Sequence, residues 1–400
     1  MKRRIKFVVE RYWPARGGIE EAAGLFADLC KKDFEVLVVT HQNHSYGNSL
    51  FNTTSGLRTF NSYADPNGIK VLPLLPGCTG RIMMLPIMMR HFIGVRRLVP
   101  QWSFNLLYNF YHIAFKKRLS KIVADSDVVL CFSGGYLGIL TQKICHRIGI
   151  PIGFISSIHP NRWDDSTLAI KAYRKSSFVN TNTHIAKSFL ISKGVPEKII
   201  FPFPRPIKEY VIPGKHLFIN KYGAGSPTIL FVGRREPYKG LDLLLEVFPK
   251  VIKTMPLARL VIIGPGKKKE SAPYCIDLGE TDDQEKQNAY AACDIVCVPS
   301  QSESLGMVYL EAWYNSKPVI ACPIPEILEI IDHGENGILV EPNRDSLLAG
   351  LVGLCNDRAK QQQMGNKGRK KYDLLYSNRI IYNDMLNLIN SLLLAKSPDQ

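Results

Sequence analysis

Two glutamates eight residues apart stand in the stretch PSQSESLGMVYLEA, residues 299–312. A run typical of a buried strand, DIVCVPS, precedes them, and residues 307–314 are predicted to form a helix. Glu303 is therefore expected in the connecting turn and Glu311 inside the helix. At roughly 1.5 Å of rise per residue, the two carboxylates lie at most about 12 Å apart along the helix axis. That separation is too long for one compact group, so the spacing favours a long ligand.

Two cations flank a second strand-to-helix turn, in the segment FVGRREPYKGLDLLLEVF, residues 231–248. The strand is predicted to end at Gly233 and Arg234, and the next helix to begin near Lys239. Arg234 offers a planar fork of donors and Lys239 a compact charge, and this combination suits a diphosphate. The alternative is that both are solvated loop cations, the commoner fate of these residue types.

The helix after Glu303 adds backbone donors, because the amides of Gly306, Met307 and Val308 lie at its start, where no intrahelical acceptor exists. A carboxylate is a good acceptor for vicinal hydroxyls, as in ribose recognition. The cations would then hold a diphosphate, Glu311 a ribose, and Glu303 a sugar beyond the phosphates. That ligand is a nucleotide-sugar. The alternative is that each glutamate is an ordinary solvated side chain.

A weaker anion site is predicted near the N-terminus, where Gly17 and Gly18 stand between the strand-like run KFVVE and a helical pattern. Glycines at such a turn let the backbone approach a ligand closely, and helix amides favour an anion. A tight turn without a ligand explains the same pattern.

The elements that must position these residues alternate between strand and helix, as in a parallel α/β sheet with crossover helices. The pattern is interrupted by the Pro-rich residues 201–215, a predicted linker, and then restarts. At 400 residues, two domains are expected. We predict an N-terminal domain (1–204), a C-terminal domain (205–376) and a last helix (377–400) that crosses back, with the ligand in the cleft at the carboxyl ends of the strands.

The net charge of +16 is distributed unequally along the chain. Residues 1–210 hold 29 Lys and Arg against 13 Asp and Glu, whereas residues 211–400 hold 22 of each. Residues 66–124 contain nine bases and no acid, and they mix Arg81, Arg90, Arg96 and Arg97 with apolar side chains. This segment predicts contact with an anionic membrane surface; the alternative is an amphipathic helix pair with a solvated basic face. Nucleic acid is not expected as a partner, because the best motif lies in the neutral half.

The nine cysteines are scattered and form no CxxC pair, which indicates reduced thiols in a cytosolic protein. No apolar stretch reaches a membrane-spanning length, and the N-terminal apolar run is too short for a signal peptide. No His and carboxylate cluster predicts a metal site.

Together, GG near the N-terminus, GRREPYKG and ESLGMVYLE resemble the GT-B glycosyltransferases of family 4, whose donor site has G-R-x4-K-G followed by E-x7-E. Residues 180–199 and the turn HGENGILVEP extend the resemblance over nearly the whole chain. It implies an α/β fold of two Rossmann-like domains facing across a cleft (GT-B). It also implies transfer of a sugar from a nucleotide-diphosphate-sugar to an acceptor hydroxyl, with retention and without a metal or other cofactor.

The resemblance also implies residue roles. Glu303 is expected beside the donor sugar as a catalytic residue, Glu311 beside the ribose, and Arg234 and Lys239 on the diphosphate. A histidine that follows a first-domain strand, His159, is expected near the reacting carbon as a second catalytic residue; the alternative is a loop histidine. The predicted donor-binding residues are Gly18, Gly233, Arg234, Lys239, Glu303, Leu305, Gly306, Met307, Val308 and Glu311. In one departure, Ser304-Leu305-Gly306 replaces the family's usual Gly-Phe-Gly.

The predicted enzyme is thus a retaining hexosyltransferase of cell-surface polysaccharide or glycolipid synthesis, cytoplasmic and peripheral at the inner face of the membrane. Its acceptor would be a sugar or a lipid-linked glycan bound by the first domain. The alternatives are a soluble glycosyltransferase acting on a small sugar or polysaccharide, and a sugar-nucleotide epimerase. An epimerase would consume donor without any acceptor.

Overall fold

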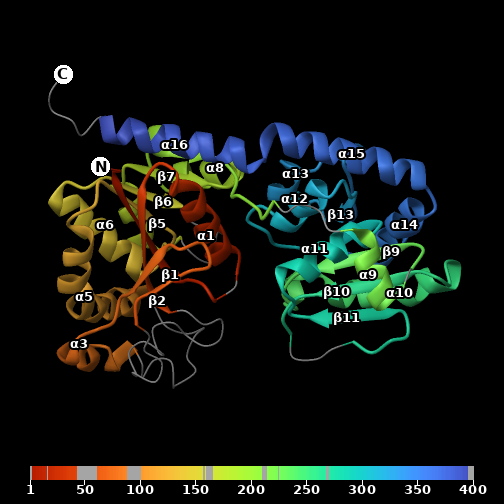
Figure 1. Ribbon diagram of the computed structural model, residues 1–400, viewed down its shortest axis with the longest axis horizontal. Coiled ribbons are helices and arrows are strands. Elements are labelled where there is room, and N and C mark those ends of the chain that lie inside the picture. The colour runs from red at the N-terminus through yellow and green to blue at the C-terminus, as the bar shows by residue number, and fades with distance from the viewer. Residues whose placement is uncertain are drawn as a thin grey trace. The chain divides into compact units, whose positions relative to one another are not determined.

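The computed structural model describes residues 2–15, 17–42, 61–87, 101–155, 158, 165–209, 214–223, 225–266 and 270–394 (Figure 1). The chain divides into two compact units. Unit 1 comprises Met1–Pro206 and Ile381–Gln400, and unit 2 comprises Ile207–Ile380. The sequence placed these boundaries at 204/205 and 376/377. Among the described residues, no helix has both the length and the apolar character that a membrane crossing requires.

Unit 1 is built on an eight-stranded sheet, in the order β3-β4-β2-β1-β5-β6-β7-β8 within the described residues. Neighbouring strands are parallel except β3 and β4, which are antiparallel. The strands are β1 (Arg4–Arg11), β2 (Glu35–Gln42), β3 (Tyr63–Ala64), β4 (Lys70–Pro73), β5 (Val128–Cys131), β6 (Ile152–Ile155), β7 (Phe178–Thr181) and β8 (Ile200–Pro202).

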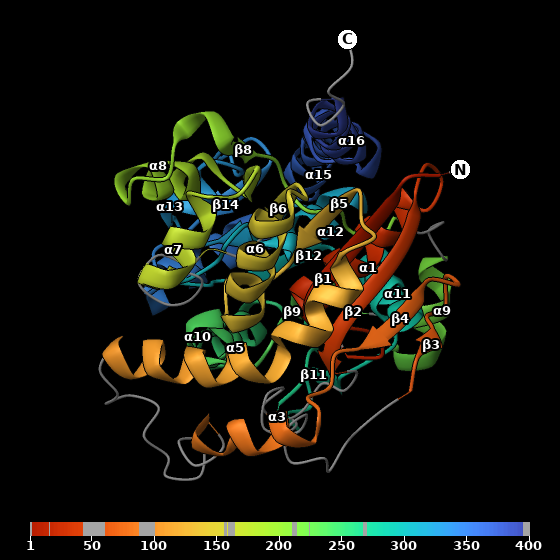
Figure 2. The same cartoon turned by 90° about the vertical axis from the view of Figure 1, so that its left-hand side faces the viewer.

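Helices cover both faces of this sheet because side chains alternate along its strands. On β1, Ile5, Phe7 and Val9 pack into a core with α1 (Gly18–Cys30) and α16 (Asn378–Leu394), whereas Val8 packs into the core on the other face. That second face carries α3 (Cys78–Met83), α5 (Gln101–Val123), α6 (Tyr136–Ile148), α7 (Thr167–Tyr173) and α8 (His184–Ser192). Figure 2 shows α5, α6 and α7 in front of the sheet.

Unit 2 holds a parallel six-stranded sheet, in the order β11-β10-β9-β12-β13-β14 among the described residues. Its strands are β9 (Thr228–Val232), β10 (Arg259–Ile263), β11 (Cys275–Gly279), β12 (Ile295–Val298), β13 (Val319–Ala321) and β14 (Gly337–Leu339). Its helices are α9 (Lys215–Tyr222), α10 (Leu241–Thr254), α11 (Asp283–Ala292), α12 (Met307–Tyr314), α13 (Pro325–Leu328), α14 (Arg344–Cys355) and α15 (Arg358–Leu375). The strand order reverses between β9 and β12, and ligands of open α/β sheets bind outside the carboxyl ends of strands at such a point.

The predicted linker is wrong at its start, because residues 200–202 form β8 at the edge of the unit 1 sheet. Phe203 follows with its side chain buried in the unit 1 core, and Ile207 is the first residue buried in the core of unit 2. The prolines favoured a linker over a strand at these residues. An edge strand, however, tolerates a proline that a central strand would not. The passage between the units is therefore shorter than the Pro-rich composition indicated.

The last helix belongs to unit 1 over most of its length. Ile381, Met385 and Ile389 recur at helical spacing on α16 and are fully buried in the core that also contains α1. The chain therefore leaves unit 2 after α15 and completes one face of the unit 1 sheet. All nine cysteines are free thiols, and six of them are buried.

Candidate donor site at the carboxyl ends of β9 and β12

The loops that follow β9 and β12 meet because a glycine stands at their point of closest approach. After β9 the chain forms a single 3₁₀ turn, η2 (Pro237–Lys239), and Gly240 then adopts φ +76° before α10 begins. A Cβ atom at Gly240 would lie 2.3 Å from the carbonyl oxygen of Pro299. The amide of Gln301 donates to the carbonyl of Tyr238 at 2.7 Å, which joins the two loops. This contact places Lys239 beside the residues that follow β12.

Lys239 and Glu303 form an ion pair at this junction. The Nζ of Lys239 lies 2.6 Å from Oε1 of Glu303, and their side chains are only 16% and 9% exposed. Because the ammonium has three donor hydrogens, the pair leaves Lys239 able to donate to a second anion. The sequence assigned these two residues to phosphate and sugar, and the structure shows that they are direct neighbours.

The two adjacent arginines after β9 have different surroundings. Arg235 forms a largely buried ion pair with Asp277, the third residue of β11. Burial alone would raise the pKa of Asp277, but the hydrogen bond from Arg235 and two backbone amides lower it below its ordinary value. Arg234 is exposed instead, and its Nη2 donates to the hydroxyl of Tyr238 at 2.8 Å. Arg234 is thus the arginine that a ligand can reach, and Arg235 holds β11 to the loop.

Gly233, just before these arginines, is not required by the packing of unit 2. An added Cβ atom there would find its nearest neighbour at 3.5 Å, an ordinary van der Waals distance. Gly233 also lies outside the positive-φ glycines of the described chain. A side chain at this position would instead occupy space next to Arg234.

After Glu303 the chain turns into α12 through Gly306, which has φ +78°. The amides of Met307 and Val308 fall in the first turn of α12, where a helix supplies no acceptor of its own. The side chain of Leu305 is only 1% exposed and packs in the core of unit 2, so only its backbone faces a ligand. Tyr309 fixes the helix to the sheet by donating to the carbonyl of Val298 at 2.7 Å.

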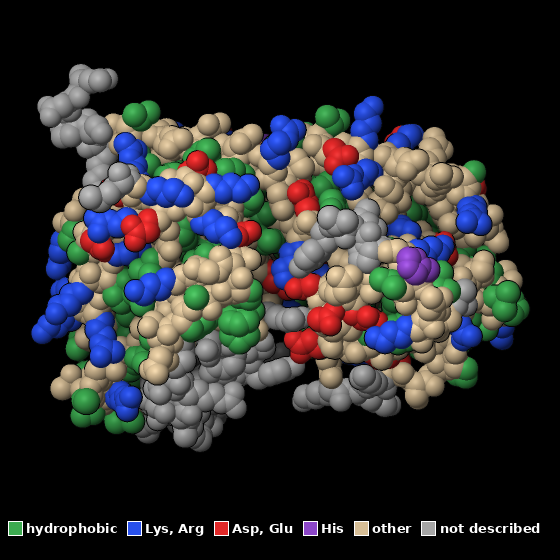
Figure 3. All heavy atoms as spheres, viewed as in Figure 1, with side chains coloured by type: hydrophobic (Ala, Val, Ile, Leu, Met, Phe, Trp, Pro, Cys, Tyr) green, Lys and Arg blue, Asp and Glu red, His purple; other side chains and the backbone are tan. Residues whose placement is uncertain are grey.

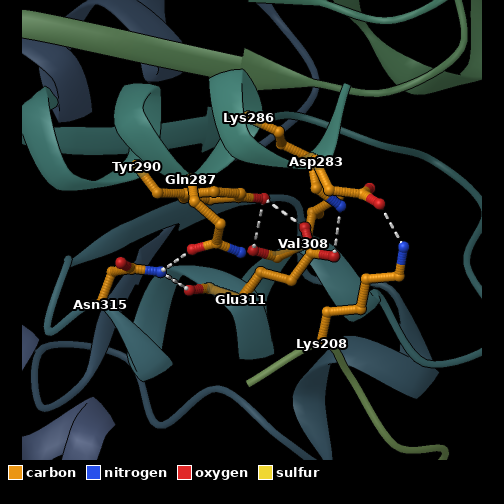
Figure 4. Close-up of polar contacts among 8 residues, drawn as sticks. All are labelled: Lys208, Asp283, Lys286, Gln287, Tyr290, Val308, Glu311 and Asn315. Carbon is orange, nitrogen blue, oxygen red and sulfur yellow. Dashed lines mark hydrogen bonds and ion pairs between the residues drawn. The ribbon is translucent and has the colours of Figure 1, made fainter. Parts of the chain in front are cut away.

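Glu311 is buried inside α12, and α11 holds both of its carboxylate oxygens (Figure 4). Lys286 contacts Oε1 at 2.9 Å, and the hydroxyl of Tyr290 donates to Oε2 at 2.7 Å. Each carboxylate oxygen has two lone pairs, so Glu311 can still accept from a pair of hydroxyls. One turn further along the chain, the side-chain amide of Asn315 donates to Gln287 of α11 at 3.3 Å and to the Glu311 carbonyl at 2.9 Å.

Sequence reasoning missed Lys286 and Tyr290, the two residues that orient Glu311. They stand four residues apart on α11 and therefore share one helix face. The i, i+4 spacing of a cation and an aromatic hydroxyl was the available signal, but nothing in the sequence related that face to α12. Next to them, Lys208 pairs with Asp283 and fixes the start of the unit 2 chain to α11 (Figure 4).

The two residues that the sequence predicted for the site in unit 1 are Gly18 and His159. Gly18 begins α1, as the sequence predicted, but the space beside Gly17 is filled by the side chain of Glu20. The carboxylate of Glu20 is buried and pairs with Nε of Arg11 at 2.6 Å. An acid in the first turn complements the helix dipole. The predicted catalytic His159 lies outside the described residues.

Candidate metal ligands do not gather in the described parts of either unit, where no group of three or more His, Cys, Asp or Glu could hold an ion. His41, one of two histidines at metal-like spacing in the sequence, is instead buried in unit 1. Its ring nitrogens contact the Leu74 carbonyl at 2.8 Å and the Tyr111 hydroxyl at 2.6 Å. Burial lowers the pKa of His41 to about 4, so the ring is neutral at physiological pH.

Gly240→Ala should lower the thermal unfolding midpoint of unit 2 more than Gly334→Ala does. Both glycines have positive φ, which costs an alanine about 1–2 kcal/mol. Only at Gly240 would the new Cβ atom also overlap a backbone oxygen, since Gly334 has no atom within 4 Å of that position. Thermal unfolding followed by circular dichroism makes the comparison. Equal losses in the two variants would show that the approach of Gly240 to Pro299 is not tight.

Comparison with known proteins shows a family match over part of the chain. Residues 215–371 match the glycosyl transferases group 1 family. A phosphatidyl-myo-inositol mannosyltransferase of Mycobacterium tuberculosis is 31% identical over 172 residues, which cover 39% of this chain and 46% of that protein. A sulfoquinovosyl transferase of Arabidopsis thaliana is 33% identical over 161 residues, covering 37% of this chain and 31% of that protein. The similarity thus spans less than half the length of these curated relatives.

Solved structures extend the likeness in fold to the whole chain. A sucrose-phosphate synthase of Thermosynechococcus elongatus superposes with a TM-score of 0.74 at 15% identity, covering 99% of this chain and 100% of that chain. Anabaena HepE in complex with UDP and glucose gives a TM-score of 0.72 at 15% identity, covering 97% and 99%. The resemblance seen in GRREPYKG and ESLGMVYLE is confirmed, since both motifs lie inside the matched residues. The match of residues 215–371 to the glycosyl transferases group 1 family thus lies within a chain that has the GT-B fold.

Proposed function

We propose that this protein is a glycosyltransferase that moves a hexosyl group from a nucleotide-diphosphate-sugar to an acceptor hydroxyl, with retention at the anomeric carbon. The observation that carries the proposal is the Lys239–Glu303 pair, 2.6 Å apart at the switch point of the unit 2 sheet. It joins a cation for the diphosphate to a carboxylate for the sugar, at the edge where α/β sheets bind nucleotides. The family match over residues 215–371 supports the same reaction class.

In this proposal, Arg234 and Lys239 bind the diphosphate, with the amides of Met307 and Val308 as further donors. Transfer leaves an additional negative charge on the departing nucleoside diphosphate, and fixed cations beside it stabilise the transition state. Gly233 supports the assignment because its missing side chain leaves space that unit 2 itself does not use. Gly306 contributes by starting α12, and Leu305 by its backbone.

Glu311 binds the ribose hydroxyls and Glu303 the donor sugar. The two carboxylates are held by different partners. Residues of α11 fix both oxygens of Glu311, which suits ribose recognition. Glu303 is fixed by Lys239, the same lysine that would hold the phosphates. Structures of Anabaena HepE with UDP and with UDP-glucose support a nucleotide-diphosphate-sugar donor. Gly18 and His159 are proposed to complete the site from unit 1.

The acceptor is proposed to be a sugar or a lipid-linked glycan bound by unit 1, in cell-surface polysaccharide or glycolipid synthesis. The mycobacterial relative named for phosphatidyl-myo-inositol supports a lipid-linked acceptor. We propose a cytoplasmic location at the inner face of an anionic membrane, and no nucleic-acid partner. Of the arginines assigned to membrane contact, Arg81 lies in the last turn of α3, and Arg90, Arg96 and Arg97 lie outside the described residues.

A donor screen followed by product analysis tests the proposed function. Nucleoside diphosphates and their sugars are first ranked by the shift they cause in the unfolding midpoint of the full chain, because a ligand of the native state stabilises it. The best donor is then incubated with sugar and lipid-linked acceptors, and products are identified by mass spectrometry and anomeric NMR. Transfer with a retained anomer is expected. Consumption of donor without acceptor would indicate an epimerase, and an inverted anomer would contradict retention.

Transfer should be unaffected by EDTA, because Arg234 and Lys239 supply the positive charge that a divalent ion supplies at other diphosphate sites. Rates with EDTA, and with magnesium or manganese restored, should agree within about twofold. The measurement is the initial rate of product formation after exhaustive dialysis against the chelator. A loss of activity that either metal reverses would overturn the metal-independent assignment.

A further inference from the structure

Unit 1 contains a second candidate site, a cavity of about 970 Å³ between α5, α6 and α7 on one helical face of its sheet. These helices lie side by side in front of the sheet in Figure 2. The volume is at the upper end of the range for small-molecule pockets, about 300–1,000 Å³. Nothing in the proposed transfer reaction uses this cavity.

Each of the three helices turns a basic stripe toward the cavity. On α5 the lining residues His112, Lys116 and Ser120 are spaced by four, and so fall on one face. On α6, Lys143 and Arg147 have the same spacing, and Lys171 on α7 is joined by Lys175 in the turn that follows this helix. Lys and Arg side chains gather over the α5 and α6 side of unit 1 in Figure 3.

The positive charge in the cavity has no counter-charge within the described protein. No acidic side chain lines the described cavity. Six lining cations form no ion pair with any described residue: Lys116, Lys143, Arg147, Lys171, Arg174 and Lys175. The last turns of α6 and α7 supply only about half a negative charge each. Six full positive charges outweigh these dipoles, so the cavity attracts an anion.

The titration of two lining residues agrees with this charge balance. Partial burial, and then the charges of Lys171 and Lys175, lower the pKa of Lys143. Partial burial, followed by Lys116, Lys143 and Arg147, lowers the pKa of His112. In both cases the electrostatic neighbours are cations alone. A bound polyanion would relieve this repulsion.

The walls between the cations are apolar. Ile139, Ile144 and Leu168 line the cavity below the charged side chains, and Ile148 stands at the end of α6 with 43% of its surface exposed. A solvated polyanion such as a nucleic acid gains nothing from apolar walls. A ligand with an anionic head and a hydrocarbon portion would contact both kinds of surface.

Topology separates this cavity from the edge of the sheet where an acceptor is expected. In a parallel sheet, the crossover helices run antiparallel to the strands, so their C-terminal turns lie near the amino ends of the next strands. The cavity is lined mainly by the second half of α6 and by α7 with the turn after it, which lead into β6 and β7. Ligands of α/β sheets bind at the opposite, carboxyl edge.

We propose that the cavity between α5, α6 and α7 binds the phosphate head of a single anionic lipid, with the lipid's hydrocarbon against Ile139, Ile144, Ile148 and Leu168. The concave shape selects one molecule over a flat bilayer surface. The six lining cations, which have no ion-pair partner among the described residues, select a phosphate over a neutral head group. This site does not depend on the proposed transfer reaction.

Binding of dioctanoyl phosphatidic acid to the full chain, below its micelle-forming concentration, tests the proposal by calorimetry at low ionic strength. We expect saturable binding at one site, weakened about a hundredfold or more by Lys116→Gln with Lys171→Gln, since each lysine contributes a charged contact. Lys117→Gln with Lys121→Gln is the matched control: it removes the same charge from α5 at exposed residues outside the cavity lining, and should leave the affinity unchanged. An unchanged unfolding midpoint verifies that both double variants fold.

Three results would overturn the proposal. Equal weakening by the cavity and control variants would mean nonspecific attraction to a basic surface. Equal affinity for inorganic pyrophosphate, lost in the same variant, would mean a free-phosphate site without a lipid contribution. Binding to phosphatidylglycerol vesicles but not to the lipid monomer would mean a bilayer contact. Because every arm measures binding of a lipid or phosphate, failure here leaves the test of sugar transfer unaffected.

Discussion

Lys239→Ala should weaken binding of the preferred nucleoside diphosphate by about ten- to hundredfold and also lower the unfolding midpoint of the chain. The first effect follows from the lost contact to phosphate, about 1.5–3 kcal/mol for a charged hydrogen bond. The second follows from Glu303, which is 9% exposed and would lose its partner. Breaking a buried ion pair on one side leaves an uncompensated charge, at a cost of up to about 3–5 kcal/mol. Titration calorimetry and thermal unfolding measure the two effects separately.

Two further variants separate the role of Lys239 in binding from its role in folding. Arg234→Ala should weaken binding of the same nucleotide about tenfold without moving the midpoint, because Arg234 is exposed and, among the described residues, its side chain hydrogen-bonds the Tyr238 hydroxyl alone. Lys239→Ala combined with Glu303→Gln should recover most of the stability, since it removes the unpaired charge, but not the affinity. Unchanged nucleotide binding in both Arg234→Ala and Lys239→Ala would remove the diphosphate assignment.

The sequence predicted those elements best whose local pattern and tertiary role agree. The helix expected at residues 307–314 has the same bounds as α12. Strands buried on both faces, such as β1 and β9, were clear as continuous apolar runs. By contrast, β11 is an edge strand with mostly half-buried residues and a central aspartate, and β8 contains a proline. Each of these two strands forms by pairing with another strand, β10 or β7, whose residues lie outside the local sequence.

For the candidate site, the sequence predicted residue types and spacing but not partners. It placed Lys239 and Glu303 in one site from a family pattern, whereas their direct pairing depends on Gly240 approaching Pro299 to within a distance that excludes a side chain. It assigned Arg234 to the diphosphate but could not show that Arg235 is held in an ion pair, because only the fold brings Asp277 to the second arginine. The same holds for Lys286 and Tyr290, which act on Glu311 from another helix.

Residues 66–124, which contain no acid, hold only part of the basic surface that the fold assembles. Lys116, counted in that segment, lines the cavity of unit 1 on α5. Its companions on α6 and α7 lie beyond residue 124, where acids reappear in the sequence and dilute the local charge balance. Packing three helices together concentrates charges that are separated along the chain. A basic patch is therefore a property of the fold more than of any one segment.

Glu303→Gln and Glu311→Gln form a matched pair of variants for the proposed mechanism. Both glutamates are buried, each pairs with one lysine, at 2.6 Å and 2.9 Å, and each change replaces a carboxylate by an amide of the same size. Loss of the charge should therefore perturb folding similarly in the two variants. Any difference in kinetics then reports on position relative to the reacting carbon.

We expect Glu303→Gln to lower kcat about a hundredfold, a loss of roughly 2.7 kcal/mol of transition-state stabilisation. Positive charge grows at the anomeric carbon as the bond to the diphosphate breaks, and a carboxylate beside the sugar stabilises it only at that stage. Glu311→Gln should instead raise the donor KM about tenfold with kcat nearly unchanged, because ribose contacts are the same before and during transfer. Steady-state kinetics with the best donor and acceptor makes the comparison. If both variants raise KM alone, or if Glu311→Gln has the larger effect on kcat, Glu303 does not lie beside the reacting sugar.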